Sequence, residues 1–380
     1  MAFFCCSGII PSLLSSTLIA SKFKDEKNII IIENALTKLF LTPYKKTSGY
    51  EKIIIDLILK SSSWDEVHSI SFENTYVSIR RLLPFLPYVP IESFRIIKNK
   101  KNIVSTINKI ISNTKLKNLV VSDNSILLKY FYKKKFNVSF LEHGAASYRS
   151  GFQKRDFRYF LKGIISKFST LSLNIKVNSI YLSDNCNSYR SQEKVSNNNG
   201  VKAISCDLSS DIKKLYYKFI LNFKEKFPEA YDELVFIRNK SKHQKMFIYM
   251  PTAEMISDKG YYQYLQDQLN QFESDKNSFF LIKPRGDDIY RDYLNYFNLL
   301  GLEAVTFKEE VNLCIPVEFL TMFFESSTMV SSYSSSHLYI RWWLGKKTIF
   351  TEVKNHPVNK YLVNEYNAVR KDFLKLQSTN

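Results

Sequence analysis

The sequence predicts an α/β protein built on parallel sheets and divided into two domains. Short apolar runs alternate with stretches of helical spacing, and polar residues follow several of the apolar runs. Strands separated by helices are typical of parallel α/β sheets, which bind ligands beyond the carboxyl ends of their strands. A chain of 380 residues is long enough for two such domains.

The composition excludes several classes of protein. With 45% hydrophobic and 15% aromatic residues, the chain has ample material for buried cores and is not globally disordered. Its five cysteines are odd in number and form no Cys-x-x-Cys pair, and the five histidines show no zinc-ligand spacing with them. We therefore expect reduced thiols, no disulfide framework and no zinc site.

The net charge of +18 favours an anionic partner. Nucleic acid, anionic lipid, a polyanionic glycan and a nucleotide all meet that description. Residues 149–167 concentrate basic and aromatic side chains and would face a polyanionic acceptor or an anionic membrane leaflet, or else form an ordinary solvated surface.

The first twenty residues carry no charge, and two interpretations of them stay open. One is a buried strand over Ala2–Cys6, a loop, and a helix from about Pro11 to Ser21. The other is a signal peptide or membrane anchor. The first is favoured because the start of the chain lacks a basic region and because serines and Pro11 interrupt the apolar run.

The rest of the first half supplies apolar runs and helical stretches. β-Rich runs lie at Asn28–Ile32, Lys52–Leu59, Asn118–Val121 and Asn137–Leu141, and helical spacing at Ile91–Ile111, Ser125–Lys135, Leu215–Phe227 and Tyr231–Arg238. Asn239–Lys245 is charged and lacks apolar residues, so it is the expected linker. This gives an N-terminal domain of residues 1–240.

The α/β rhythm restarts after the linker. Expected strands are Met246–Met250, Ser278–Ile282, Ala304–Phe307, Thr328–Ser332 and Lys347–Thr351, and expected helices are Tyr261–Phe272, Pro316–Phe324 and His337–Leu344. Residues 245–358 form the second domain, and a terminal helix over 359–380 packs back onto the protein.

One candidate for chemistry lies in the first domain, where Glu142, His143 and Gly144 follow a strand. A carboxylate held at a strand end could take a proton from an attacking hydroxyl, and the imidazole could act as acid, base or hydrogen-bond donor near neutral pH. The alternative is a solvated loop acid beside a satisfied histidine.

Three further candidates lie at strand-to-helix junctions of the second domain. Lys283 and Arg285 follow a strand and suit a phosphate or carboxylate. Glu318 falls in the first turn of a helix that starts near Pro316, where it could accept from sugar hydroxyls or simply favour the helix dipole. Ser334, Ser335 and Ser336 precede an apolar helix and form a ready phosphate site, although ordinary capping needs only one serine.

In this order, the motifs resemble those of bacterial GT-B sialyltransferases and polysialyltransferases of the family 52 and family 38 type. Those enzymes make lipooligosaccharide and capsule. Their acidic-acidic-Gly motif is similar to Glu142-His143-Gly144, and their Lys-x-His-Pro motif aligns in order with Lys283-Pro284-Arg285. Their Pro-x-Glu helix start is similar to Pro316-Val317-Glu318, and their serine pair to Ser334-Ser335.

The resemblance implies a GT-B fold, with two Rossmann-like domains and a cleft between them. It also implies inverting transfer of sialic acid, or of a related nonulosonic acid, from a CMP-activated donor to a glycan hydroxyl, without a metal or another cofactor. Glu142 is then the base, Glu318 binds the ribose or base of CMP, and the three serines hold its phosphate. Such an enzyme would act in the cytoplasm, free or peripherally associated with the anionic inner membrane.

The chain departs from the family pattern at two places, which keeps alternatives open. His143 replaces the second acid, and Arg285 stands near the place of the family's histidine, so that His337 or His143 would supply the proton instead. The donor could be another nucleotide sugar such as CMP-Kdo. A non-enzymatic basic protein that binds nucleic acid is the rival of a different class, although no nucleic-acid motif is present.

Overall fold

The computed structural model describes parts of the first half of the chain and most of the second half. The described residues are 2–6, 10–23, 25–39, 50–78, 93–97, 100–112, 118–122, 137–141, 177–182, 202–251, 261–272, 277–284, 293–332, 334–352, 354, 367, 370, 371 and 374. Their contacts divide the chain into two compact units. Unit 1 holds strands β1–β8 with helices α1 and α4, and unit 2 holds α2 together with every element from α8 onward.

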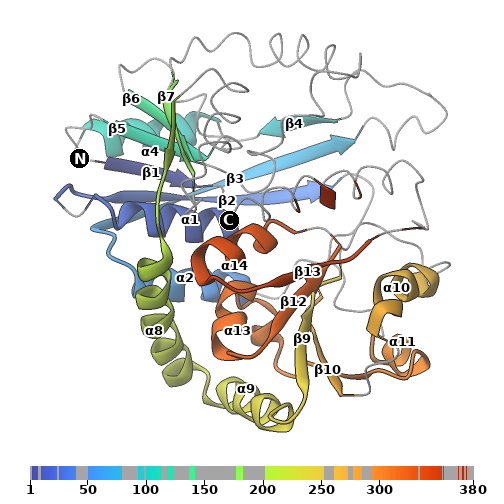
Figure 1. Ribbon diagram of the computed structural model, residues 1–380. Helices are drawn as coiled ribbons and strands as arrows, with labels where there is room; N and C mark the ends of the chain where they lie inside the picture. The colour runs from blue at the N-terminus through green and yellow to red at the C-terminus, as the bar shows by residue number, and fades with distance from the viewer. Residues whose placement is uncertain are drawn as a thin grey trace. The chain divides into compact units, whose positions relative to one another are not determined.

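Unit 1 is built on an eight-stranded sheet in the order β4-β3-β2-β1-β5-β6-β7-β8 (Figure 1). All neighbouring strands are parallel except β3 and β4. The strands are β1 Ala2–Cys6, β2 Ile29–Leu39, β3 Glu66–Ser78, β4 Ser93–Ile97, β5 Asn118–Ser122, β6 Asn137–Leu141, β7 Val177–Leu182 and β8 Lys202–Ser205; the helices are α1 Ile10–Ala20 and α4 Lys100–Ser112.

The strand and the helix expected at the N-terminus are confirmed, and the loop expected between them lies outside the described residues. β1 lies inside the sheet between β2 and β5, and α1 buries Leu13, Leu14, Leu18 and Ile19 almost completely. Among the described residues, no helix is both long and apolar enough to cross a bilayer.

Two predictions in the first half are wrong. Lys52–Leu59 is not a strand but part of α2, Tyr50–Ser61. Its four isoleucines favour a strand by residue type, but the charged side chains recur every fourth residue at Lys52, Asp56 and Lys60, which is helical spacing. Ile91–Ile111 divides into β4 and α4 instead of one helix.

Unit 2 is built on a five-stranded parallel sheet in the order β11-β10-β9-β12-β13. Its strands are β9 Lys245–Tyr249, β10 Ser278–Ile282, β11 Glu303–Thr306, β12 Thr328–Ser331 and β13 Thr348–Phe350. Its later helices are α8 Ser209–Lys226, α9 Pro228–Lys240, α10 Tyr261–Leu269, α11 Tyr293–Leu299, α12 Glu310–Leu313, α13 Val317–Phe323 and α14 Ser336–Leu344. Each expected strand of this half is confirmed to within one or two residues.

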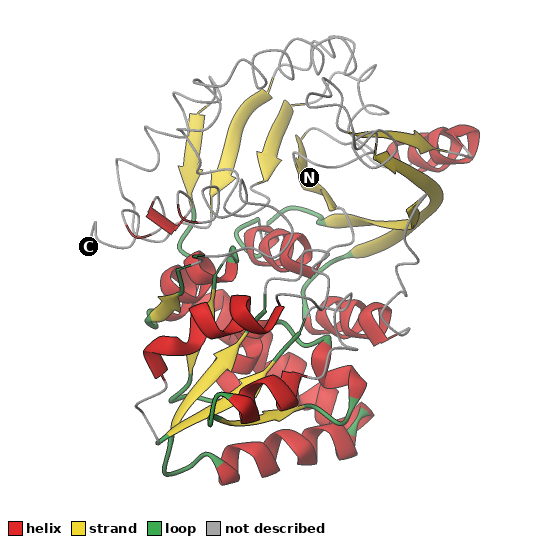
Figure 2. Cartoon of the chain, turned by 90° about the vertical axis from the view of Figure 1, so that its right-hand side faces the viewer, coloured by secondary structure: helices red, strands yellow, loops and turns green. Residues whose placement is uncertain are grey.

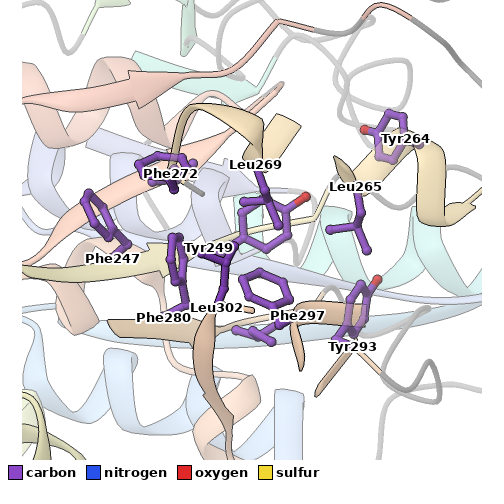
Figure 3. Close-up of a cluster of buried hydrophobic side chains, with 12 residues drawn as sticks. Phe247, Tyr249, Tyr264, Leu265, Leu269, Phe272, Phe280, Tyr293, Phe297 and Leu302 are labelled. Carbon is purple, nitrogen blue, oxygen red and sulfur yellow. The ribbon is translucent and has the colours of Figure 1, made fainter. Parts of the chain in front are cut away.

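Helices cover both faces of this sheet, which explains why its strands read as continuous apolar runs (Figure 2). On one face, aromatic side chains of β9 and β10 pack with Tyr264, Leu265 and Leu269 of α10 and with Phe297 of α11 (Figure 3). The cluster is rich in aromatic residues, with the rings of Phe247 and Phe280 stacked at a centroid distance of 5.1 Å. It holds the carboxyl ends of the central strands in fixed positions.

Helices α8 and α9 belong to unit 2, whereas residues 1–240 were expected to form the first domain. Phe219 of α8 packs on Phe319 of α13 with ring centroids 4.8 Å apart. Glu233 of α9 accepts hydrogen bonds from the backbone N–H groups of Lys308 and Glu309 and from the Asn312 side chain. The segment Asn239–Lys245 therefore joins two elements of one unit.

The expected terminal helix over 359–380 lies mostly outside the described residues. Asn367, Arg370, Lys371 and Leu374 are helical, and the Arg370 guanidinium donates to the carbonyl of Phe350 at the end of β13.

Candidate functional site

The order of the strands in unit 2 defines one position at which α/β sheets bind ligands. The sheet winds outward from β9 through β10 to β11, and in the other direction through β12 to β13. Ligands of such sheets bind at the carboxyl ends of the strands on either side of this reversal. Here those strands are β9 and β12, which are tied together by the Met250 N–H bond to the Val330 carbonyl at 2.9 Å. The segment that follows β12 is the serine-rich one.

The serine loop, which we define as the serines of 331–336, joins β12 to α14. Ser332 is fully buried, and its hydroxyl lies 3.1 Å from the hydroxyl of Tyr264 on α10. Ser334 and Ser335 are half-buried and precede the first turn of α14. The loop thus has a buried, anchored side and two hydroxyls at the amino end of a nine-residue helix, where the dipole favours an anion.

Ser334 accepts hydrogen bonds from the first turn of α14 through both its hydroxyl and its carbonyl. The backbone N–H of Ser336 donates to the Ser334 hydroxyl at 3.2 Å, and the N–H of His337 donates to the Ser334 carbonyl at 3.2 Å. Because the Ser334 oxygen acts as an acceptor, its own proton can be donated to an anion. The hydroxyls, more than the first amides of α14, are therefore the donors that this loop offers.

Glu318 is the most unusual charged residue of the described site. It lies in the first turn of α13, directly after the helix start at Pro316, and is only 3% exposed. Burial raises the pKa of its carboxyl, while the Ser336 side chain and the charge of Lys283 pull that pKa down. Three of the predicted site residues are thereby brought together: Lys283 directly after β10, Glu318 in α13 and Ser336 in α14.

One oxygen of this carboxyl group has no partner. Within the described part of the chain, Glu318 Oε1 is buried and accepts no hydrogen bond. A buried acceptor of this kind is costly unless a water molecule or a ligand group donates to it. A hydroxyl or amine of a ligand is the chemistry that would complete it.

Lys283 connects the end of β10 to the loop before α13. Its backbone N–H continues the ladder to the Tyr249 carbonyl, and its ammonium group donates to the carbonyl of Leu313 at 2.9 Å. The ammonium therefore has a fixed place, and its positive charge acts on Glu318 and on the thiol of Cys314. Burial nevertheless raises the pKa of Cys314 to about 11, so that thiol is not a nucleophile.

The structure argues against His337 as a proton donor. His337 is completely buried, stacks on Phe350 with ring centroids 4.2 Å apart, and places Nε2 3.1 Å from the Ser331 carbonyl. Because a carbonyl only accepts, Nε2 carries the proton of the neutral ring. Burial lowers the pKa of this imidazole to about 3, so it is uncharged at neutral pH. The physical reason is that nearly all of α14 is enclosed.

Three predicted site residues lie outside the described residues. Glu142 and His143 follow directly after β6, and Arg285 follows two residues after Lys283 in the chain. The basic stretch over 149–167 also lies outside them. In the part of the chain that is described, no three histidine, cysteine, aspartate or glutamate side chains gather as a metal site would require.

The sequence analysis did not find the polar network beneath the serine loop. The Tyr249 hydroxyl donates to Gln268 Oε1 at 2.9 Å, and Thr351 donates to the same oxygen at 3.3 Å. These side chains and the Tyr264–Ser332 pair are buried. A tyrosine within the apolar run of β9 was the available signal, because a buried hydroxyl needs a partner.

No family model and no curated protein sequence matches this chain. Solved structures do. One is the sialyltransferase from Photobacterium damsela, with 10% identity and a TM-score of 0.50 over 99% of this chain and 79% of that one. Another is the Staphylococcus aureus MnaA–UDP co-structure, with 7% identity and a TM-score of 0.50 over 98% of this chain and 87% of that one.

The chain has a GT-B fold. At this level of identity the likeness concerns the fold alone, and it agrees with the two α/β units described above. Within unit 2, the serine loop and Lys283 follow the carboxyl ends of β12 and β10, and Glu318 lies near both of them.

Proposed function

We propose that this chain is an inverting glycosyltransferase that transfers sialic acid, or a related nonulosonic acid, from a CMP-activated donor to a glycan hydroxyl. The acceptor would be a surface polysaccharide or a lipooligosaccharide. The proposal is supported by the order of the motifs along the sequence and by the GT-B fold, which the chain has in common with a sialyltransferase.

The observation that carries the proposal is the unpartnered oxygen of Glu318 beside Ser336. A buried acceptor and a group of hydroxyl donors stand close together at the binding edge of the sheet. A nucleoside monophosphate offers the complementary pair, because its ribose hydroxyls donate and its phosphate accepts. In this proposal Glu318 accepts from the nucleoside and Ser334 and Ser335 donate to the phosphate.

The chemical step then needs one base and a stabilised leaving group. The acceptor hydroxyl attacks the anomeric carbon of the sugar while Glu142 takes its proton, and the bond to the CMP phosphate breaks. The serine hydroxyls, Lys283 and Arg285 offset the charge on the departing phosphate without a metal. His143 remains the candidate for any proton that the phosphate receives.

A second candidate is a GT-B transferase for another nucleotide sugar, such as CMP-Kdo or a UDP-sugar. The specific observation in its favour is that MnaA, which has the same fold, was solved with UDP. The hydroxyl-and-phosphate chemistry of the site suits a CMP or a UDP nucleotide equally well.

Two measurements test the proposal. Thermal unfolding with CMP, UDP and GDP identifies the nucleotide, because only a bound one raises Tm; a concentration 100 times Kd stabilises by about 2.7 kcal/mol. Release of CMP from CMP-sialic acid, with galactose-terminated or sialylated acceptors, then tests turnover. Stabilisation by UDP alone supports the second candidate. If the folded protein is stabilised by none of the three nucleotides and binds RNA with steep salt dependence, the glycosyltransferase proposal is wrong and the nucleic-acid-binding alternative is supported.

A further inference from the structure

Helix α8 carries an exposed face that the proposed reaction does not use. Its opposite side is packed, with Ile212, Phe219 and Phe223 fully buried. The outer side exposes Tyr217 by 64% and Leu221 by 68%. At about 100° per residue these two side chains, four positions apart, lie one above the other.

Lysines flank these two apolar side chains on both sides. Lys213 and Lys224 lie along one edge of the stripe and Lys214 and Lys218 along the other, and all four are exposed. Lys224 also lies over the ring of Tyr231, 5.1 Å from its centroid. Within α8, Glu225 is the one exposed acid, and it lies seven positions after Lys218 on the same edge of the stripe. We call Lys213, Lys214, Tyr217, Lys218, Leu221 and Lys224 the α8 basic face.

We propose that the α8 basic face is the surface through which this protein binds an anionic phospholipid bilayer. An interfacial helix of this kind buries tyrosine and leucine at the level of the headgroups while lysines pair with anionic lipids above them. The lysine stems can lie along the apolar surface and keep their charges in the headgroup layer. The length of α8, 18 residues, gives a face about 27 Å long.

The positive charge of the α8 basic face favours an anionic bilayer as its binding partner over a second copy of this chain. Two α8 basic faces brought together would place lysines against lysines, which opposes association. An anionic membrane has the complementary charge and requires no matching shape. The net charge of +18 adds a longer-range attraction toward the same surface.

Vesicle sedimentation tests the proposal with the full-length protein and without any nucleotide. The vesicles are phosphatidylcholine alone, or phosphatidylcholine with about one-third phosphatidylglycerol. Tyr217→Ser/Leu221→Ser removes the apolar stripe, and Lys214→Glu/Lys218→Glu reverses one edge of charge. We expect each pair to raise the apparent Kd for anionic vesicles at least about tenfold, and added salt to weaken wild-type binding.

Matched controls separate this face from general surface properties. Leu299→Ser removes an equally exposed leucine, 63% exposed on α11. Lys242→Glu/Lys347→Glu makes the same charge change at two exposed lysines outside α8. Both controls should stay within about twofold of wild type, and circular dichroism should show all variants folded.

Three results would overturn the proposal. The first is equal binding of neutral and anionic vesicles, and the second is wild-type affinity in both α8 double variants. The third is a concentration-dependent dimer that Tyr217→Ser/Leu221→Ser abolishes, which would make the face a contact between copies. None of these results depends on nucleotide binding, so the membrane proposal and the proposed glycosyltransferase function are tested separately.

Discussion

At the scale of single residues, Glu318 is costly to the fold, and in the proposed function it binds the nucleoside. A carboxyl that is 3% exposed and has one oxygen unpartnered within the described chain is unfavourable when it ionises. Because burial raises its pKa above the usual 4.5, its contribution to stability is complete at pH below 4.5. That contribution is lost as the pH rises through the raised folded-state value.

Glu318→Gln should therefore change the pH dependence of stability. The variant cannot ionise, so its Tm relative to wild type should increase as the pH is raised from about 5 to 8. In the same variant we expect the Kd for the nucleotide to rise about tenfold, since an amide is a poorer acceptor than a carboxylate. Differential scanning fluorimetry across pH, with and without CMP, measures both. A constant difference in Tm would mean that Glu318 does not titrate in this range.

Replacing Ser335 tests the proposed phosphate site more directly than replacing Ser334. Ser334 accepts from the Ser336 N–H, so its replacement removes a cap as well as a donor. Ser335 makes no side-chain capping bond and is half-buried. Ser335→Ala should weaken binding of CMP about tenfold and of cytidine hardly at all. Equal losses for the two ligands, measured by calorimetry, would place the phosphate elsewhere.

At the scale of elements, the contact of α9 with α12 ties two distant parts of unit 2 together. Glu233 accepts from Lys308 N–H at 2.6 Å, Glu309 N–H at 3.1 Å and Asn312 Nδ2 at 2.9 Å. Because the Ala substitution leaves these donors without their acceptor, Glu233→Ala should lower the free energy of unfolding by about 2–3 kcal/mol in urea. Glu229→Ala, an exposed acid on the same helix, should change it by less than about 0.5 kcal/mol.

The elements of unit 2 were predictable because buried parallel strands are short apolar runs with polar ends. The strands of unit 1 were harder to predict, because some of them are not continuous apolar runs. β3 mixes polar and apolar residues and exposes Val67 and Ser69, so no apolar run marks it. In α2 the isoleucines obscured the spacing of its charges.

The positions of the candidate site residues along the chain could be predicted, but their burial and hydrogen-bond partners could not. Strand ends point to the serine loop, Lys283 and Glu318 from the sequence alone. The enclosure of His337 depends on what packs around α14, although a helix with apolar residues on all sides, Leu338–Trp343 among them, is typical of a buried one. The partners of Gln268 come from β9 and from the end of β13, which no local pattern relates.

At the scale of the whole molecule, the two units do not follow the order of the sequence. Helix α2 lies between β2 and β3 in the chain, yet it packs on α8 and α12 of unit 2. Its Ile54 and Ile58 are completely buried. Unit 2 thus depends on residues far from the rest of it.

Ile58→Ala should consequently destabilise unit 2. Removing a fully buried isoleucine costs about 2–5 kcal/mol, and α8 should lose protection from hydrogen exchange along with α2. Val67→Ala, at a half-exposed position of β3, should leave α8 protected. Protection of α8 that survives Ile58→Ala would show that α2 is a dispensable addition to that unit.

This placement of α2 also affects how the chain is made. Roughly 150 residues separate Ser61 from the first residue of α8, so the helix leaves the ribosome well before its partner exists. At about 5–20 residues per second the delay is on the order of 10 s. Throughout that interval the isoleucines of α2 lack the partners in α8 that cover them in the folded protein.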